Sequence, residues 1–190
     1  MKNIAIFGSG KGSNAENIIN YFTLHKSVSI KLIITNNENA GIINVAKKKK
    51  INFLVLNKIK PFIDENILKK LTVHQINFIV LAGFLLRIPD IIITNFPNAI
   101  INIHPALLPN FGGKGMYGLN VHRSVLENKE KFSGITIHFV NNEYDKGKII
   151  FQAKCGILKN DTPKLLAKRI QKLEHQFYPI IIEKILQNDN

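Results

Sequence analysis

Short apolar runs alternate with helix-like segments along the first half of this chain, and this order restricts the fold more than any other feature. It is typical of a parallel sheet covered by helices on both faces, because parallel neighbours need a crossover connection. The predicted strands are residues 3–8, 30–35, 53–56, 78–82 and 99–103. Helices are predicted between them, at about residues 15–25, 41–49 and 61–74.

The pattern changes towards the C-terminus, where residues 134–140 and 149–157 are two apolar strands joined by residues 141–148. This connection is too short for a helical crossover, so we expect the two strands to pair antiparallel. A last helix should begin at Asp161-Thr162-Pro163, and Pro179 should bend or interrupt it. Its packing face is predicted at Leu166, Ile170, Leu173, Phe177 and Ile180.

The sequence therefore predicts an α/β fold: a Rossmann-like, mostly parallel sheet flanked by helices, with an antiparallel strand pair near the C-terminus. The 190 residues contain no internal repeat and no linker-like break, so residues 1–190 are expected to form a single domain. Hydrophobic residues make up 45%, enough for a buried core. No apolar run reaches the roughly 18 to 20 residues of a membrane helix, and the start lacks a signal-peptide pattern. We expect a cytoplasmic protein without a membrane partner.

A formal net charge of +13 raises the question of an anionic partner. Lysines are spread along the whole chain, and the one dense run, residues 47–50, closes a predicted helix, where cations complement the helix dipole. A nucleic-acid partner is therefore not expected. The single cysteine, Cys155, lies in an apolar run without an adjacent base and is predicted to be a buried, inert packing residue. The sequence does not fix the oligomeric state, and a homodimer is compatible with it.

The glycine-rich turn at residues 8–14 follows the first predicted strand and opens a helix. Amide N–H groups at such a helix start are a natural seat for phosphate. The turn matches neither the P-loop pattern nor a clean G-x-G-x-x-G. A tight strand-to-helix turn without a ligand is the alternative.

A second group of polar residues ends the strand at residues 99–103, where alternation places Asn102 and His104 on one side. His104 can carry a proton near neutral pH, and Asn102 can donate to a developing oxyanion. Asp145, in the connection after His138, could face His104, orient its ring and raise its pKa, or it could accept a proton through water from an attacking amine. A capped strand and a solvated turn are the alternatives. No zinc-ligand spacing and no nucleophilic serine elbow occur, so neither a metal nor an acyl-serine is expected.

Five ordered sequence blocks carry a resemblance to a known family. They are FGSGKGSN, LAGFLLRIP, NIHPALLPNFGGKGMYG, SGITIHFVNNEYDKGKIIFQ and LEHQFYP, and they span nearly the whole chain. Together the blocks resemble the glycinamide ribonucleotide formyltransferase family, folate-dependent enzymes of purine synthesis. The resemblance implies transfer of a formyl group from 10-formyltetrahydrofolate to the amine of 5-phosphoribosylglycinamide, by direct attack and without a covalent enzyme intermediate. It implies small-molecule substrates, glycinamide ribonucleotide and a reduced folate.

Site residues follow from the same resemblance. The implied catalytic residues are Asn102, His104 and Asp145, with Asn102 and a protonated His104 stabilising the oxyanion. The implied substrate-binding residues are Gly12, Ser13 and Asn14 at the phosphate and glycine arm, and Glu174 at the ribose. The implied folate-binding residues are Leu85, Leu86, Arg87, Ile88, Val140, Asn141 and Asp145.

Two segments depart from the usual family pattern. Arg87 stands one place later than the family's arginine, so only backbone contacts are expected from it. Residues 111–118 are longer and richer in glycine than usual, and they are predicted to form a mobile loop in which Lys114 could approach an anion or stay solvated. Two alternative functions remain at this point. Methionyl-tRNA formyltransferase shares the Asn-x-His-Pro core but has an extra C-terminal domain, and a non-catalytic RNA-binding protein would use the basic surface.

Overall fold

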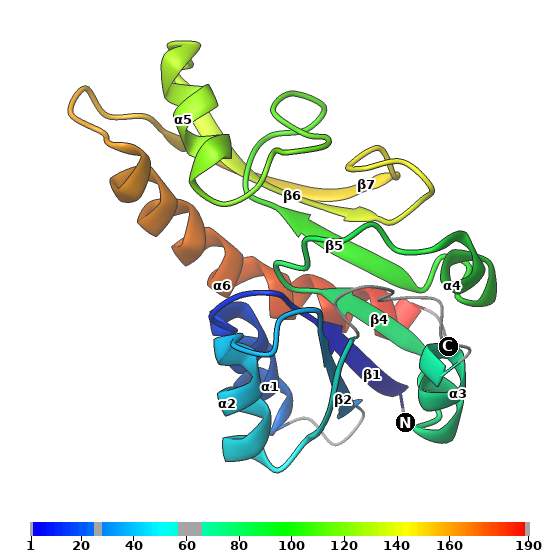
Figure 1. The fold of residues 1–190 in the computed structure, drawn as a ribbon. Helices are drawn as coiled ribbons and strands as arrows, with labels where there is room; N and C mark the ends of the chain where they lie inside the picture. Colours follow the sequence, from blue (N-terminus) through cyan, green and yellow to red (C-terminus); the bar gives the residue numbers. More distant parts are fainter. Residues whose placement is uncertain (1, 25–27, 57–65, 189–190) are drawn as a thin grey trace. The chain divides into compact units, whose positions relative to one another are not determined.

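The computed structural model describes residues 2–24, 28–56 and 66–188 (Figure 1). The chain folds as two compact units, Met1–Ile101 and Asn102–Asn190. Strand β5 (Ile100–His104) runs across the boundary between them. Since Asn102 and His104 are the last alternate residues of β5, the strand carries them into the second unit.

Four parallel strands form the sheet of the first unit, in the order β3-β2-β1-β4. Strands β1, β2 and β4 are mostly apolar and buried, whereas β3, at the edge of the sheet, has no buried residue. Such continuous apolar runs are typical of parallel strands covered on both faces. The strands are β1 (Lys2–Phe7), β2 (Val28–Thr35), β3 (Asn52–Val55) and β4 (Phe78–Leu81).

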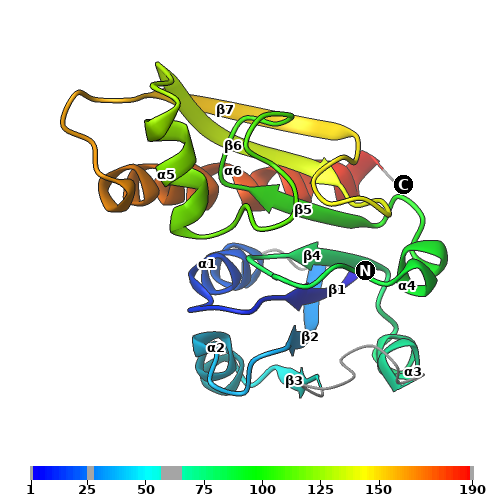
Figure 2. The ribbon, with the colours of Figure 1, turned by 45° about the horizontal axis from the view of Figure 1, so that its top comes forward.

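Helices cover both faces of these four strands. In both views α1 (Ser13–Phe22) and α2 (Gly41–Lys49) lie together on one side and α3 (Asn66–Val73) on the other (Figures 1 and 2). The predicted helix at residues 41–49 is confirmed, and Lys50 ends it in a left-handed conformation. The predicted ends at residues 25 and 61–65 lie outside the described residues. A short helix, α4 (Asp90–Asn95), was not predicted, because six residues are too few to show a periodic apolar pattern.

The second unit contains the predicted antiparallel pair, β6 (Phe132–Phe139) and β7 (Ile149–Gly156). Helix α6 (Pro163–Asn188) contacts both strands, and α5 (Leu119–Glu127) contacts α6. Helix α5 begins directly after the predicted loop at residues 111–118, in a stretch for which the sequence predicted no element. The chain thus has the predicted fold class: a mostly parallel sheet flanked by helices, with an antiparallel strand pair near the C-terminus.

Helix α6 begins as predicted and continues further than predicted. The Leu165 amide donates to the Thr162 hydroxyl at 3.3 Å, which caps the helix next to Pro163. Pro179 does not interrupt α6. The buried face follows a 3.6-residue spacing from Ile170, so Tyr178 is fully buried while the predicted Ile180 is 36% exposed. The packing face at Leu166 and Ile170 is confirmed, and its extension to Ile180 is wrong.

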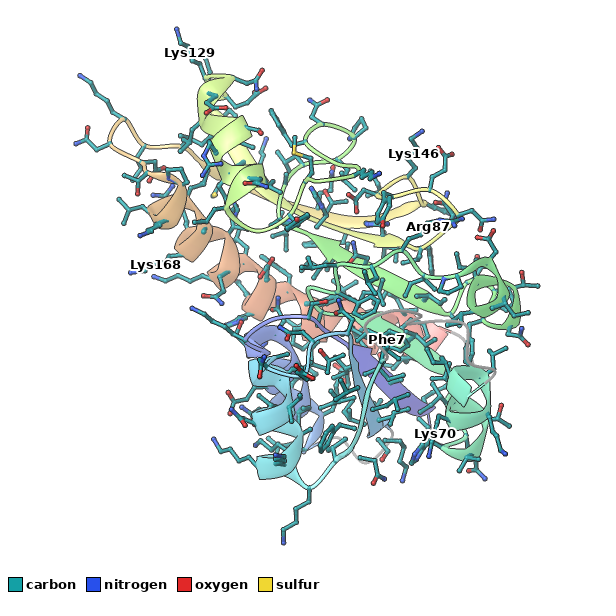
Figure 3. The ribbon with its side chains drawn as sticks, in the orientation of Figure 1. Phe7, Lys70, Arg87, Lys129, Lys146 and Lys168 are labelled. Carbon is teal, nitrogen blue, oxygen red and sulfur yellow. The ribbon has the colours of Figure 1, made fainter. Side chains whose placement is uncertain are left out.

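The basic side chains belong to many different elements. Figure 3 shows Lys70, Lys129, Lys146 and Lys168 projecting outward from the ribbon, whereas Phe7 lies in the core of the first unit. The run at the end of α2 makes polar contacts with α1, since Lys48 lies 3.2 Å from Glu16. Within the described ranges, no helix is both long and apolar enough to cross a membrane.

Candidate active site

The carboxylate of Asp145 lies at the centre of a polar cluster in the second unit. Its Oδ1 is 3.4 Å from the Asn102 side-chain nitrogen, and its Oδ2 is 3.5 Å from His104 Nδ1. The structure therefore brings together the three residues predicted as catalytic. His104 is 3% exposed, so the cluster is largely shielded from water.

Two turn conformations hold Asp145 in place. Asp145 itself has φ 57°, the left-handed region that aspartate tolerates better than bulkier residues. Two residues later, a Cβ on Gly147 would collide with the Phe139 carbonyl, so the β6–β7 connection closes only with glycine there. On the opposite side the Gly113 amide donates to Asp145 Oδ2 at 2.8 Å. Gly112 permits this approach, because its Cβ would lie 3.1 Å from the Asp145 Cβ.

The tautomer of His104 follows from its neighbours. Its Nε2 lies 2.7 Å from the Phe111 carbonyl oxygen. A carbonyl only accepts hydrogen bonds, so Nε2 carries a proton and Nδ1 is the ring atom that faces Asp145. Phe111 adopts φ 56°, an unusual conformation for a bulky residue, which marks this contact as a locally strained one.

The pKa of His104 reflects two opposing effects. Burial lowers the pKa of His104, and the opposing effects of the Asp145 carboxylate and the Phe111 carbonyl are smaller. The predicted effect of Asp145 is confirmed, because its carboxylate raises the pKa of His104, but burial of the ring outweighs it and the net shift is downward.

The charge of Asp145 results from the opposite balance. Burial raises the pKa of Asp145, but the nearby His138 and His104 rings and the hydrogen bond from the Gly113 amide together lower it by more. The net shift is downward, so Asp145 is ionised at neutral pH. A buried carboxylate held by several donors is suited to orienting a histidine.

His138 is a fourth member of the cluster that the sequence noted but did not assign. It is 2% exposed, and its Nδ1 lies 2.8 Å from the Phe139 carbonyl, which fixes the ring proton on Nδ1. Its Nε2 lies 3.2 Å from the Asn102 side-chain nitrogen and 3.6 Å from Asp145 Oδ1. His138 therefore orients the Asn102 amide. Its alternation with β6 neighbours and its position just before the Asp145 loop were the available signal.

The predicted phosphate turn lies in the first unit, at the start of α1. Gly12 precedes the helix with φ 83°, and its Cβ would approach the Ile42 Cα to 2.7 Å, so only glycine fits. Ser13 and Asn14 begin α1 and are half-buried. The turn thus presents the N-terminal end of a ten-residue helix, whose dipole favours an anion.

The segment after β4 holds the other first-unit residues. Leu85 is 44% exposed, Leu86 is half-buried and Ile88 is buried. Arg87 forms an ion pair with Asp90 of α4 at 2.6 Å and lies at the surface, as Figure 3 shows. Arg87, which stands one place later than the family's arginine, thus pairs with a residue of the next helix.

The remaining predicted site residues lie in the second unit. Val140 is half-buried at the end of β6, and exposed Asn141 accepts a hydrogen bond from the Glu143 amide at 3.0 Å. Glu174 is half-buried on α6, one turn before Tyr178. Lys114 is exposed between Gly113 and Gly115, both with positive φ. Among the described residues, no group of three or more His, Cys, Asp or Glu side chains is arranged to hold a metal ion.

Cys155 lies on β7 and is only half-buried, which corrects the expectation of a buried packing residue. Burial raises the pKa of its thiol, and nearby Arg169 opposes this effect only in part. A raised pKa disfavours the thiolate, in agreement with an inert residue.

Comparison with known proteins places the chain in a family. The family described as Formyl transferase matches residues 2–182. The chain belongs to this family. It is 33% identical to the phosphoribosylglycinamide formyltransferase of Bacillus subtilis, over 100% of this chain and 97% of that protein. It is 40% identical to the chloroplastic phosphoribosylglycinamide formyltransferase of Arabidopsis thaliana, over 98% of this chain.

The chain spans 66% of the Arabidopsis protein and 61% of a second chloroplastic relative, from Vigna unguiculata, so it covers slightly less than two thirds of either. Solved structures are also similar. The phosphoribosylglycinamide formyltransferase of Anaplasma phagocytophilum has a TM-score of 0.90 and 35% identity, with 98% of this chain and 87% of that chain covered. The Bacillus halodurans enzyme has a TM-score of 0.89 and 32% identity, covering 100% and 97%. The resemblance carried by the five sequence blocks is thus confirmed.

Proposed function

We propose that this chain transfers the formyl group of 10-formyltetrahydrofolate to the amine of 5-phosphoribosylglycinamide, a step of purine synthesis. The observation that carries the proposal is the convergence of Asn102, His104 and Asp145 in one buried cluster, with 3.4 and 3.5 Å between the carboxylate and the other two. Relatives of almost equal length bear the name of this activity. The cluster would also suit transfer to methionyl-tRNA, but the names of these relatives do not support that acceptor. RNA binding leaves the cluster without a role.

The proposed reaction begins with attack of the glycinamide amine on the formyl carbon. A carbon–nitrogen bond forms and the carbonyl oxygen becomes an oxyanion, to which Asn102 donates a hydrogen bond. His104 takes the proton that the attacking amine releases, through Nδ1, and the resulting imidazolium stabilises the oxyanion. Collapse breaks the bond between the formyl carbon and N10 of the folate, and the proton passes from His104 to N10. No atom of the protein becomes bonded to the formyl group.

Asp145 has an orienting role in this sequence. Its negative charge lies next to His104 Nδ1 and so favours the imidazolium at the moment when it forms. The long 3.4 Å contact with Asn102 is the weakest of the amide's two contacts, and it is the one expected to yield to the oxyanion. Asn102 then keeps its other N–H on His138.

The substrates would be held by the residues that the resemblance implies. The phosphate and glycine arm would lie on Gly12, Ser13 and Asn14 at the start of α1, where the helix dipole favours an anion. Glu174 would contact the ribose hydroxyls. The folate would contact Leu85, Leu86, Arg87 and Ile88 together with Val140, Asn141 and Asp145. Exposure of the Leu85 side chain, at 44%, provides apolar surface for the pterin ring.

An acceptor-competition assay tests the proposed function. The protein is incubated with 10-formyltetrahydrofolate and either glycinamide ribonucleotide or methionyl-tRNA, and release of tetrahydrofolate is followed spectroscopically. Release that depends on the ribonucleotide alone is expected. Release only with the tRNA would show that methionyl-tRNA, and not the ribonucleotide, is the acceptor. Salt-sensitive RNA binding without any release of tetrahydrofolate would favour a non-catalytic RNA-binding protein.

The location, the nucleic-acid binding and the oligomeric state of the protein stay predictions. We expect a cytoplasmic protein without a nucleic-acid partner, and a homodimer is compatible with the sequence. Sedimentation across a concentration series would determine the oligomeric state, and a filter-binding titration at low salt would reveal an RNA partner.

A further inference from the structure

Ser9 links three loops of the first unit. It lies in the glycine-rich turn, is 7% exposed, and is not among the residues assigned above to either substrate. Its hydroxyl donates to the Asn36 side-chain oxygen at 2.5 Å, in the loop after β2. The same hydroxyl accepts the Leu85 amide at 3.0 Å, in the loop after β4. One oxygen thus joins the ends of three neighbouring parallel strands.

The main chain of Ser9 makes the same connections. Its amide donates to the Gly83 carbonyl at 3.0 Å, and its carbonyl accepts from the Asn37 side chain at 3.4 Å. Every polar atom of Ser9 therefore has a partner in one of the two adjacent loops. A buried residue whose hydrogen bonds are all used in this way restricts the relative position of the segments it joins.

The loops that Ser9 joins are the ones assigned to different substrates. The glycine-rich turn leads within four residues of Ser9 to Gly12 and Ser13, the proposed phosphate site, and Leu85 opens the proposed folate segment. We propose that Ser9 is a positioning residue that sets the spacing between the acceptor's phosphate site and the folate-binding segment. This inference rests on the proposed function.

Removal of the hydroxyl should act on substrate binding more than on folding. In Ser9→Ala the Leu85 amide loses its acceptor, and the main-chain bond between Ser9 and Gly83 is left to hold the two loops together. The segment after β4 then shifts relative to the glycine-rich turn. We expect the KM for the formyl donor to rise about tenfold, the size of effect that follows from losing one buried hydrogen bond. The turnover number should change by less than the KM.

The experiment compares Ser9→Ala with Asn36→Ala and a matched control. Asn36→Ala removes the side-chain oxygen that accepts the Ser9 hydroxyl, and Asn36 is half-buried. This variant should also raise the donor KM, but by a smaller factor than Ser9→Ala. The control is Thr23→Ala, whose hydroxyl bonds to the Ile19 carbonyl of its own helix at 2.7 Å. It should leave both KM values unchanged. The Tm of all three variants is measured beside the kinetics, and Ser9→Thr, which keeps the hydroxyl, tests for rescue.

The outcomes separate the inference from the function on which it rests. A raised donor KM in both Ser9→Ala and Asn36→Ala, with recovery in Ser9→Thr and a turnover number close to that of the wild type, supports the positioning role. A fall in Tm with unchanged KM values would show that Ser9 only stabilises the fold and would overturn the inference. If Ser9→Ala does not fold, Asn36→Ala alone tests the inference: a raised donor KM supports it, and a lower Tm with unchanged KM values overturns it. A wild-type protein that neither binds a folate analogue nor transfers formyl would overturn the proposed function, and this inference with it.

Discussion

Each oxygen of the Asp145 carboxylate faces two groups. Oδ1 faces the Asn102 amide and His138, and Oδ2 faces His104 and the Gly113 amide. The carboxylate therefore connects the proposed oxyanion donor, the proposed proton carrier and the loop that follows β5. Burial of this cluster strengthens each of the interactions, because the local dielectric constant is low.

Removal of the Asn102 amide is the first prediction at the scale of single residues. Asn102→Ala removes a donor to the oxyanion, and we expect the turnover number to fall on the order of 100- to 1,000-fold. The KM values should change little, since this hydrogen bond strengthens only in the transition state. Steady-state kinetics with both substrates varied would measure this. A large rise in KM with normal turnover would instead indicate a ground-state contact.

The second residue-scale prediction concerns His122, a buried histidine of α5 that the sequence did not single out. It is 4% exposed, and within the described part of the chain its Nδ1 has no hydrogen-bond partner. Burial lowers the pKa of His122 to about 4 from its usual 6.5, with a smaller contribution from nearby His104. Below pH 6.5 the unfolded chain binds a proton that the folded chain does not, so stability is complete above pH 6.5 and falls towards pH 4.

This shift of about 2.5 pH units corresponds to roughly 3 kcal/mol of unfolding free energy at about 1.4 kcal/mol per unit. Urea unfolding at pH 7, 6, 5 and 4 would measure it for the wild type and for His122→Gln, a neutral variant that cannot titrate. As the pH falls from 7 to 4, the unfolding free energy of the wild type should decrease relative to that of His122→Gln, because only the wild type gains a proton on unfolding. Parallel curves would contradict the assignment.

At the scale of elements, the connection between β6 and β7 positions Asp145, and Gly147 permits that connection. A Cβ at Gly147 would overlap the Phe139 carbonyl, which belongs to the backbone and cannot rotate away. Gly147→Ala should therefore displace the loop, lower the Tm by several degrees and reduce turnover by at least tenfold. Gly156→Ala is a matched control at the end of β7, where a Cβ would meet nothing within 4 Å. Equal behaviour of the two variants in thermal melting and turnover would contradict this account.

The elements also show what the sequence could and could not predict. Alternation along β5 was enough to place Asn102 and His104 on one side, since a strand has a fixed period of two. The net pKa of His104 could not be predicted, because it depends on burial by segments far along the chain. Ser9 was also missed as a link between loops, because its partners Asn36 and Leu85 are 27 and 76 residues away in sequence.

Helices were predicted well only where they are long enough to show a period. Helix α2 has nine residues and a basic end, and its predicted bounds are confirmed. Helix α4 has six residues and begins directly after Pro89, so its few apolar positions show no pattern. The proline in α6 was expected to bend or interrupt the helix, but the helix is not interrupted, and Tyr178 and Ile182 on either side of Pro179 are fully buried.

At the scale of the whole molecule, the single-domain prediction has a direct consequence for unfolding. The chain has two compact units, yet strand β5 belongs to both, because the boundary falls between Ile101 and Asn102. Neither unit can unfold without breaking this strand. We expect one cooperative transition in scanning calorimetry, with equal calorimetric and van't Hoff enthalpies. Two resolved transitions would show that residues 1–101 and 102–190 are separate folding units.

The central claim is that Asp145 organises a buried cluster that moves a formyl group between two small molecules. The most direct test is the single-turnover rate of Asp145→Asn with saturating 10-formyltetrahydrofolate and glycinamide ribonucleotide. In either orientation of the new side chain, its NH2 group would face an N–H donor, of Asn102 or of Gly113, that now donates to the carboxylate. The variant keeps the shape of the side chain but loses the hydrogen bonds and the charge that orient the cluster. The account predicts a folded variant with wild-type secondary structure and a rate lower by about 100- to 10,000-fold. A rate equal to that of the wild type would contradict it.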